Sequence, residues 1–282
     1  MSPSKKPYSI TDRIVLITGA ANGIGLALAR KVKAKSGIPV CIDLPSPALD
    51  ALSHELREPS LTIACDVTDA PGMEKVIAHT VQRFGGIDVV VANAGIERIA
   101  PTWVMPAHDF ERVLQVNIFG TYRTIRPALP HVMKRQGHIV AVSSVSALIP
   151  WPLSAPYGAS KAFTASFLRT LRMELTGTGT TAGAVYFGNI DTNMMKHAET
   201  NPAASEMLAR SPSLGLGVKP KTPEHAADRI IRNIESRGAI GFSHAEVVAT
   251  FVLNGLVQLL DDLTARSTGI GEVIRKHYGG QA

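Results

Sequence analysis

A serine, a tyrosine and a lysine stand close together in the middle of the chain, and together they could move a proton. Tyr157 and Lys161 are four residues apart, so a helix that begins near Ala155 places them on one face, one turn apart. Ser144 follows an apolar run that predicts a strand over 138–142. Open α/β sheets bind their ligands where the carboxyl end of a strand leads into a helix. These three side chains are therefore candidates for a catalytic site.

The chemistry that they offer is acid–base catalysis at an oxygen atom. A phenol with a pKa of about 10 is a poor base at neutral pH, and a nearby cation such as Lys161 lowers that pKa. Tyr157 could then accept a proton from an alcohol or donate one to a carbonyl, while Ser144 binds the same oxygen. A tyrosine and a lysine on an ordinary helix face form the same pattern, so the surrounding elements have to distinguish the two cases.

A glycine-rich turn near the start of the chain lies between a predicted strand over 13–18 and a predicted helix over 24–35. Gly19, Gly23 and Gly25 permit a tight turn and a close approach of the backbone to a pyrophosphate. The N-terminus of the following helix offers free N–H groups and positive partial charge to that anion. The turn therefore predicts a dinucleotide site, with a glycine turn that binds no ligand as the alternative.

A second predicted strand, over 38–42, ends at Asp43. This acid comes 18 residues after Gly25, close to the spacing expected for a carboxylate that binds the adenosine ribose. A carboxylate accepts hydrogen bonds from both ribose hydroxyls and repels a 2′-phosphate, and residues 44–47 include no Arg or Lys. The sequence therefore favours NAD over NADP. The alternative role for Asp43 is the N-cap of a helix over 46–57.

Strands and helices alternate along the rest of the first half of the chain. The predicted elements are strands over 61–65 and 87–92 and helices over 71–84 and 106–135, the last interrupted near Asn117. Such alternation is typical of a parallel sheet with right-handed crossovers. Asn117 lies among apolar residues, so it must find hydrogen-bond partners if it is buried. A purely structural amide remains the alternative to a functional one.

Taken in order, these motifs resemble those of the short-chain dehydrogenase/reductase family, over about residues 10–240. The matching pieces are Thr18-Gly19-Ala20-Ala21-Asn22-Gly23-Ile24-Gly25, Asp66-Val67, Asn93-Ala94-Gly95, Asn117, Ser144, and Tyr157 with Lys161. The resemblance implies an α/β fold: a Rossmann-like, doubly wound, parallel seven-stranded sheet with helices on both faces. It also implies a bound nicotinamide dinucleotide and, with an acid at Asp43, a preference for NAD.

The resemblance also assigns the site residues. The catalytic set is Asn117, Ser144, Tyr157 and Lys161, and Ser144 and Tyr157 also bind the substrate. The cofactor set is Gly19, Ala21, Asn22, Gly23, Ile24, Gly25, Asp43, Asp66, Val67, Asn93, Ala94, Gly95, Tyr157, Lys161, Ile190 and Thr192. Lys161 is expected to bind the nicotinamide ribose, and Asn117 to fix a backbone kink and a water that connects Lys161 with solvent. The family's Pro-Gly after the sixth strand becomes Phe187-Gly188 here.

The C-terminal third extends beyond these motifs. Residues 193–220 predict a lid over the substrate cleft, and residues 245–282 predict a helical extension. Within that extension, 245–260 is apolar apart from a narrow stripe, and we expect it to contact the core or a second subunit before any membrane surface. The apolar face of the helix over 155–175 could pack on the core or on a partner. The resemblance favours a partner, in a homodimer or homotetramer.

Bulk composition narrows the classes of function. The chain has 282 residues, 18% of them charged, and a net charge of +6 without any run of five basic residues, so a nucleic-acid surface is not expected. It contains no continuous apolar stretch of about 18 residues, so no membrane span is expected. Cys41 and Cys65 lie in apolar runs and predict reduced core residues of a cytoplasmic protein. No His or Cys pattern has metal-ligand spacing. One domain over 12–282 is expected, after a flexible arm over 1–11.

The sequence therefore predicts an NAD-dependent oxidoreductase that interconverts a secondary alcohol and a ketone or aldehyde. Trp151, Leu153, Met194 and Met195 fall near the predicted site and suggest a lipophilic substrate. Two alternatives remain open. One is an NADPH-dependent carbonyl reductase, and the other is a catalytically silent dinucleotide-binding regulator.

Overall fold

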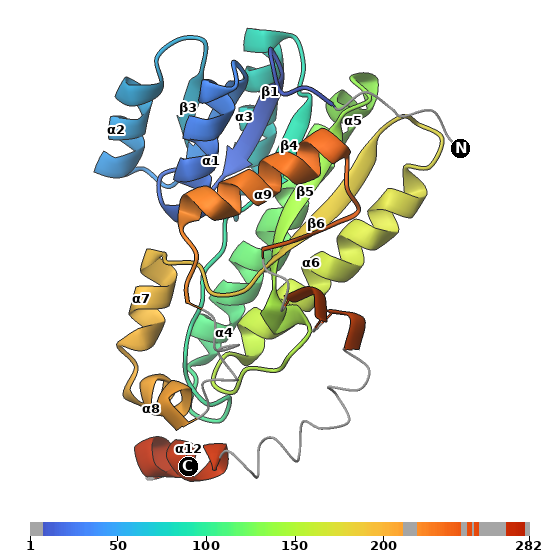
Figure 1. Ribbon diagram of the computed structural model, residues 1–282. Coiled ribbons are helices and arrows are strands. Elements are labelled where there is room, and N and C mark those ends of the chain that lie inside the picture. The colour runs from blue at the N-terminus through green and yellow to red at the C-terminus, as the bar shows by residue number, and fades with distance from the viewer. Residues whose placement is uncertain (1–7, 211–218, 244–246, 250, 254–268, 280–282) are drawn as a thin grey trace.

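The computed structural model describes residues 8–210, 219–243, 247–249, 251–253 and 269–279, which form a layered α/β domain (Figure 1). Its centre is one sheet with the strand order β3-β2-β1-β4-β5-β6-β7, in which every neighbouring pair is parallel. The strands are β1 (Ile14–Thr18), β2 (Ile38–Asp43), β3 (Leu61–Ala64), β4 (Val89–Ala92), β5 (His138–Ser144), β6 (Thr181–Phe187) and β7 (Ile240–Phe242). The predicted doubly wound, seven-stranded parallel sheet is confirmed.

The strands form because their residues suit a sheet that is covered on both faces. All five residues of β1 are buried, and so are all four of β4. Successive side chains point to opposite faces, so Leu16 enters one hydrophobic cluster while Val15 and Ile17 enter the other. Apolar runs without alternation are what such doubly covered strands require.

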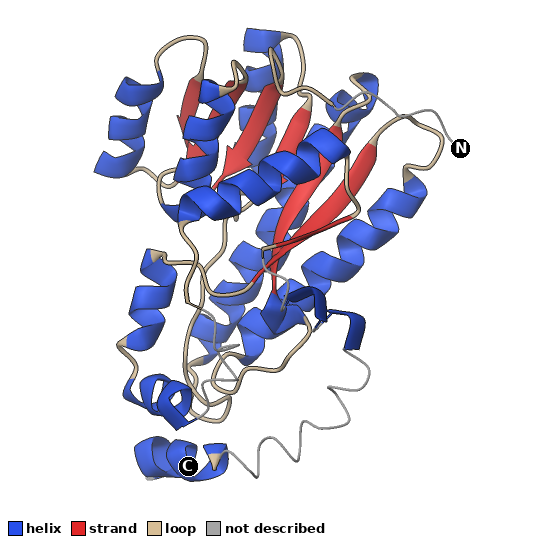
Figure 2. Cartoon of the chain, in the orientation of Figure 1, coloured by secondary structure: helices blue, strands red, loops and turns tan. Residues whose placement is uncertain are grey.

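Helices cover both faces of the sheet (Figure 2). One layer contains α1 (Gly23–Ala34), α2 (Pro47–Leu56) and α9 (Pro223–Ser236), which bury Leu28, Leu52 and Ile230 against the same cluster. The other layer contains α3 (Ala70–Phe84), α4 (Ala107–Leu114), α5 (Gly120–Lys134) and α6 (Ala155–Glu174). The two layers hold the strand ends at fixed positions, and those ends carry the predicted site.

Local signals in the sequence account for several helix boundaries. Thr222 accepts a hydrogen bond from the His225 N–H and so caps the start of α9. The α3 helix has Pro71 in its first turn and ends at Gly85, whose positive φ closes the helix. The predicted interruption near Asn117 is a π-helical turn over Gln115–Phe119, between α4 and α5.

Segments near both ends of the chain contribute residues to the core. The predicted arm over 1–11 is too long, because Ile10 is 1% exposed in the core and the Tyr8 N–H donates to the Glu235 carbonyl. Of the apolar segment 245–260, Val247 is buried and the Phe251 ring contacts Tyr186 and Phe242, whereas Val248, Val252 and Leu253 are exposed. Residues 254–260 lie outside the described residues.

The predicted lid begins with two helices, α7 (Asn193–Glu199) and α8 (Pro202–Arg210), and its residues 211–218 lie outside the described part of the chain. The C-terminal helix α12 (Ile270–Tyr278) packs against α8 (Figure 1). Ala203, Met207 and Val273 form a small apolar cluster there with Leu153, from the loop before α6. This cluster attaches the lid helices to the loop that precedes the tyrosine.

Candidate active site

A cleft runs along the carboxyl edge of the sheet, where the strand order reverses between β1 and β4. It encloses about 350 Å³. Its lining includes Gly19, Asn22, Gly23, Ile24, Asp43, Asp66, Val67, Asn93, Ala94, Gly95, Tyr157, Lys161 and Thr192. This crevice is the general ligand site of open α/β sheets. Thirteen of the predicted site residues thus share one cleft, although they come from distant parts of the sequence.

The glycine-rich turn has the geometry that a pyrophosphate needs. Gly19 and Gly23 have φ values of +67° and +52°, and a Cβ on Gly25 would lie 2.0 Å from the Gly19 carbonyl oxygen. Side chains at these positions would therefore strain the turn or push it open. The side chain of Asn22, at the N-cap of α1, makes no capping hydrogen bond. The N-terminus of α1 thus remains available to an anion, and the cleft fits a dinucleotide phosphate.

Asp43 lies at the end of β2, beside this turn. Its Oδ2 accepts a hydrogen bond of 2.8 Å from the Ala21 N–H, and its Oδ1 accepts one of 2.8 Å from the Leu44 N–H. Ser46, rather than Asp43, caps α2 by accepting from the Leu49 N–H. The alternative role of Asp43 as that helix cap is therefore wrong. A carboxylate held in this way leaves acceptor sites for ribose hydroxyls.

The end of the cleft lined by Asp43 and Asp66 contains a cation that we did not predict. Arg112 of α4 forms an ion pair of 2.8 Å with Asp66 and also donates to Thr68. Burial raises the pKa of Asp66, but hydrogen bonds from Arg112 and Thr68 outweigh it and hold that pKa below its usual range. The guanidinium is thus already bound to a carboxylate.

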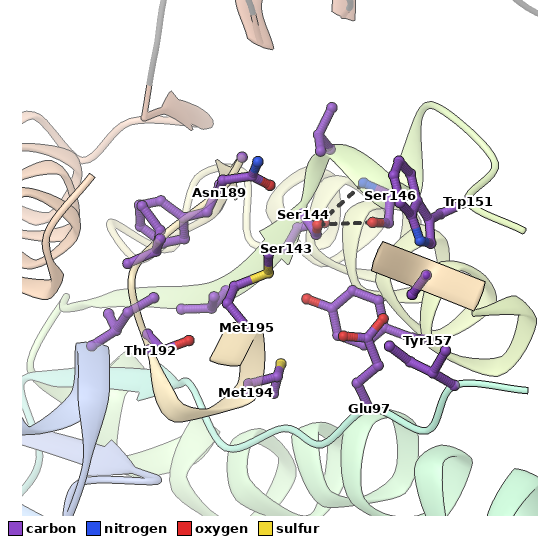
Figure 3. Close-up of a pocket in the computed structure, with 18 residues that line it drawn as sticks. Glu97, Ser143, Ser144, Ser146, Trp151, Tyr157, Asn189, Thr192, Met194 and Met195 are labelled. Atoms are coloured by element: carbon purple, nitrogen blue, oxygen red, sulfur yellow. Dashed lines mark hydrogen bonds between the residues drawn. The ribbon is translucent and has the colours of Figure 1, made fainter. Parts of the chain in front are cut away.

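Tyr157 and Lys161 line the opposite end of the cleft, and Ser144 lies beside Tyr157 in a neighbouring pocket. The Lys161 Nζ lies 5.4 Å from the centre of the Tyr157 ring and donates to the Val142 carbonyl at 2.9 Å. The Ser143 hydroxyl donates to the Lys161 carbonyl, so two bonds join the end of β5 to α6. The Ser144 Oγ accepts from the Ser146 N–H at 3.1 Å (Figure 3). These contacts fix the three functional groups that the spacing predicts to act together.

Burial sets the protonation of the pair. It lowers the pKa of Lys161 to about 8, against the opposite effect of the Glu97 carboxylate. It also raises the pKa of Tyr157, as does Glu97, whereas the hydrogen bond with Ser144 lowers it. At neutral pH the lysine therefore remains mainly a cation, and the tyrosine remains a phenol.

Asn117 lies behind the cleft and does not line it. Its side chain is buried, accepts from the Ile96 N–H at 2.9 Å, and donates to the Ile96 carbonyl and the Ser160 hydroxyl. A Cβ on Gly95 would lie 3.4 Å from the Asn117 Oδ1 and 3.5 Å from the Lys161 Nζ. These are ordinary contact distances, so Gly95 packs directly beside both groups. In this structure Asn117 supports the loop beside Lys161.

Several other predicted cofactor residues support the backbone around the cleft. Gly25 and Ala21 are buried beneath the glycine turn, and the Asn93 amide donates to the carbonyls of Thr18 and Gly19. Ile190 lines the neighbouring substrate pocket. The remaining members of the predicted set face the cleft directly.

A second pocket opens beside Tyr157 and Ser144 (Figure 3). Its walls are mainly apolar and include Ile99, Trp151, Phe187, Ile190, Met194 and Met195. Met194 and Met195 belong to α7, so the predicted lid does line the pocket. Of the predicted apolar residues, Leu153 instead packs under α8.

Glu97 is the residue of this pocket that sequence reasoning missed. Its carboxylate faces the space beside Tyr157 (Figure 3). It accepts a hydrogen bond from the Ser154 hydroxyl. A signal was available, because Glu97 comes two residues after Asn93-Ala94-Gly95, beyond the carboxyl end of β4. An acid at such a strand end lies at the ligand edge of the sheet.

Comparison with known proteins agrees with this geometry. The family model for short chain dehydrogenases matches residues 13–203. The chain is 30% identical over 229 residues to 2-(R)-hydroxypropyl-CoM dehydrogenase of Xanthobacter autotrophicus, covering 78% of this chain and 90% of that protein. It is 34% identical over 216 residues to 3-oxoacyl-(acyl-carrier-protein) reductase FabG of Thermotoga maritima, covering 75% and 87%.

Solved structures share the fold. A short-chain dehydrogenase/reductase from Burkholderia phymatum, crystallised in complex with NAD, superposes with a TM-score of 0.77 at 23% identity. The match covers 87% of this chain and 94% of that one. With the cleft, the Tyr157–Lys161 pair and the match of the family model all in agreement, this chain is a member of the short-chain dehydrogenase/reductase family.

Proposed function

We propose that this protein is an NAD-dependent oxidoreductase that interconverts a secondary alcohol and a ketone. The observation that carries the proposal is the position of Tyr157 and Lys161, which line the dinucleotide cleft, with Tyr157 also lining the apolar pocket. A proton-transfer group at the junction of a cofactor site and a substrate site is what coupled hydride and proton transfer requires.

The chain's own residues would bind and deprotonate the alcohol. The substrate oxygen lies between the hydroxyls of Ser144 and Tyr157, and Ser144 donates to it as negative charge develops. Tyr157, once it has lost its own proton and become the phenolate, takes the hydroxyl proton while the carbinol C–H bond breaks and the C=O bond forms. The nicotinamide, when bound, supplies the hydride acceptor. In reduction the same phenol returns the proton to the carbonyl oxygen.

Lys161 and Asn117 would support this step. The ammonium over the Tyr157 ring favours the phenolate, and its remaining donors can reach ribose hydroxyls. The Asn117 amide holds the Ile96 backbone, and a water beside it could connect Lys161 with solvent. Asp43 supports NAD, because its carboxylate would accept from an unmodified ribose and repel a 2′-phosphate.

Two observations support this class of substrate, namely the names of the relatives and the lining of the pocket. The names of both relatives describe a hydroxyl or oxo group on a secondary carbon, namely 2-hydroxypropyl and 3-oxoacyl. The walls formed by Trp151, Met194 and Met195 suit a lipophilic body. A secondary alcohol with an apolar skeleton therefore suits this pocket.

We also propose a homodimer or homotetramer in the cytoplasm. Phe119, Tyr122 and Met173 are large apolar side chains on the outer side of the α5–α6 layer, with exposed fractions of 45%, 43% and 76%. Exposed apolar groups of this size on one layer mark a contact surface. The free thiols of Cys41 and Cys65 agree with a reducing compartment. Among the described residues, no helix is long and apolar enough to span a bilayer.

The test combines cofactor binding with one substitution. NADH and NADPH are titrated separately against the protein by nicotinamide fluorescence, followed by a screen of secondary alcohols with NAD⁺. We expect tighter binding of NADH, and a loss of turnover of about 10³-fold or more in Tyr157→Phe with little change in NADH affinity. Tighter NADPH binding would favour a carbonyl reductase. Binding without any turnover would favour the silent regulator, and near-normal activity of Tyr157→Phe would refute the mechanism.

A further inference from the structure

A carboxylate in a mainly apolar pocket needs an explanation. Glu97 lines the pocket together with Ile99, Trp151 and Met194, and its carboxylate lies on the same side as Tyr157 (Figure 3). An ionised carboxylate is costly to bury unless several donors satisfy it. The acid therefore either has partners in the protein or awaits one in the ligand.

The protein satisfies only part of this carboxylate. The Ser154 hydroxyl, itself 1% exposed, donates to Oε1. Within the described residues this is the only hydrogen bond to the Glu97 side chain. The neighbouring Arg98 is directed elsewhere, to an ion pair with Asp109. Because a carboxylate offers about four acceptor positions, Glu97 retains room for a donor from the pocket.

The charges around the pocket indicate which donor fits. Lys161 already supplies a positive charge that acts on Glu97, and the oxidised nicotinamide would add another. A cationic group on the substrate would be repelled by both, whereas a hydroxyl donates without carrying charge. An anionic group beside Glu97 would be repelled by the carboxylate itself. A neutral hydroxyl is the donor that meets no repulsion.

We propose that Glu97, held by Ser154, is a specificity subsite that accepts a hydrogen bond from a second hydroxyl of the substrate. The substrate class is then an apolar secondary alcohol, or the matching ketone, with a further hydroxyl near the reacting carbon. This inference rests on the proposed function, because it assigns a role within the same pocket. It refines the lipophilic substrate that the sequence suggests, since it adds a carboxylate contact to mainly apolar walls.

The test compares secondary alcohols with their own hydroxylated analogues. The probes are cyclohexanol against the 1,2- and 1,3-cyclohexanediols, and 2-octanol against 2,3-octanediol, each followed by NADH formation. The measured quantity is the ratio of kcat/KM for the diol to kcat/KM for the simple alcohol. We expect wild-type protein to favour the better diol of a pair, and Glu97→Ala to lower that ratio about tenfold or more, as for one lost bond to a charged acceptor.

Three further variants sharpen the comparison. Ser154→Ala should lower the ratio less than Glu97→Ala, because it removes only the support of the carboxylate. Glu97→Gln keeps an acceptor oxygen and should retain part of the preference. Glu74→Gln is the matched control, since Glu74 is an exposed acid on α3 that lines none of the pockets described above, and its ratio should equal that of wild type. Thermal melting confirms that each variant is folded.

The outcomes separate the two proposals. If wild-type protein turns over none of the alcohols or ketones with either cofactor, the proposed function fails, and this subsite fails with it. If simple alcohols are substrates and Glu97→Ala leaves the diol ratio unchanged, only the subsite is wrong. A preference for amino alcohols over diols, lost in Glu97→Ala, would likewise overturn the assignment to a hydroxyl.

Discussion

Tyr157, Lys161 and Glu97 share one buried space, and burial affects all three in the same sense. It disfavours the charged form of each group, so it raises the pKa values of Tyr157 and Glu97 and lowers that of Lys161 to about 8. The mutual effects are smaller: Glu97 raises the pKa of both partners, and Lys161 lowers that of Glu97. A change at Glu97 therefore alters the proton affinity of both Tyr157 and Lys161.

Cofactor selectivity depends at the residue scale on Asp43. In Asp43→Ala the acceptor for ribose hydroxyls and the anchor for the Ala21 N–H are both lost. We expect the ratio of NADH to NADPH affinity to fall by about 10- to 100-fold, as for one or two lost bonds to a charged group. Fluorescence titration of both cofactors measures it.

The matched control for this prediction is Asp50→Ala, which removes an exposed carboxylate from α2 and should leave the selectivity unchanged. An unaltered ratio in Asp43→Ala itself would remove Asp43 from cofactor recognition. The anchoring of Ala21 would then be its whole contribution.

At the scale of elements, the π-helical turn over Gln115–Phe119 is part of the site because it carries Asn117. A π-helical turn widens a helix locally and often occurs at functional sites. The Asn117 amide bonds both the N–H and the carbonyl of Ile96. It thus satisfies the backbone of the loop after β4 in the way that a neighbouring strand would. The same loop carries Gly95 on the cofactor side and Glu97 on the substrate side.

Truncation of this amide should therefore destabilise the protein. Asn117→Ala leaves the Ile96 N–H and carbonyl without their partner, at a cost of about 2–4 kcal/mol in the free energy of unfolding. Urea denaturation monitored by circular dichroism measures this loss. Gln115→Ala, an exposed amide on the same turn, is the control and should change stability by less than about 0.5 kcal/mol. Equal stabilities of the two variants would contradict a supporting role for Asn117.

For the molecule as a whole, the sheet joins two hydrophobic layers, and buried polar groups fix how its last strands meet the helices. His138 at the start of β5 is fully buried and bonds to Thr181 of β6 and to Asn233 of α9. Burial lowers its pKa to about 4, and Arg237 and Arg172 act in the same direction. The native state therefore holds this imidazole neutral.

This histidine predicts how stability depends on pH. Its pKa is about 6.5 in the unfolded chain, so between pH 6.5 and 4 the unfolded state binds more protons than the native one. The free energy of unfolding should be unaffected by this group above about pH 7. It should fall by up to about 3 kcal/mol as the pH drops to 4.

Urea denaturation between pH 8 and pH 4 measures this dependence. His138→Gln should be less stable at neutral pH and show a shallower acid decline. His54→Gln changes an exposed histidine on α2 and should follow wild type. The same slope in all three proteins would show that other groups govern acid stability.

The sequence by itself determined the features that local physics controls. Continuous apolar runs predict the strands, which the structure buries on both faces. The glycines of residues 19–25 predict the turn before α1, where Gly19 and Gly23 have positive φ. The spacing of Tyr157 and Lys161 matches one helical turn. The order of these motifs was specific enough to indicate the family and its doubly wound parallel sheet. Each of these depends on residues that are neighbours in the chain, so their types and spacing suffice.

Only the tertiary structure decided which distant side chains share a space. Glu97 comes from the loop after β4 and Ser154 from the turn before α6, and they meet because β4 and β5 are adjacent and parallel. Such contacts also decide that Asn117 lies behind the cleft, that Arg112 pairs with Asp66, and that Ile10 packs in the core. No local pattern encodes them, since the same residue types would fit an exposed loop equally well until the sheet brings their partners within reach.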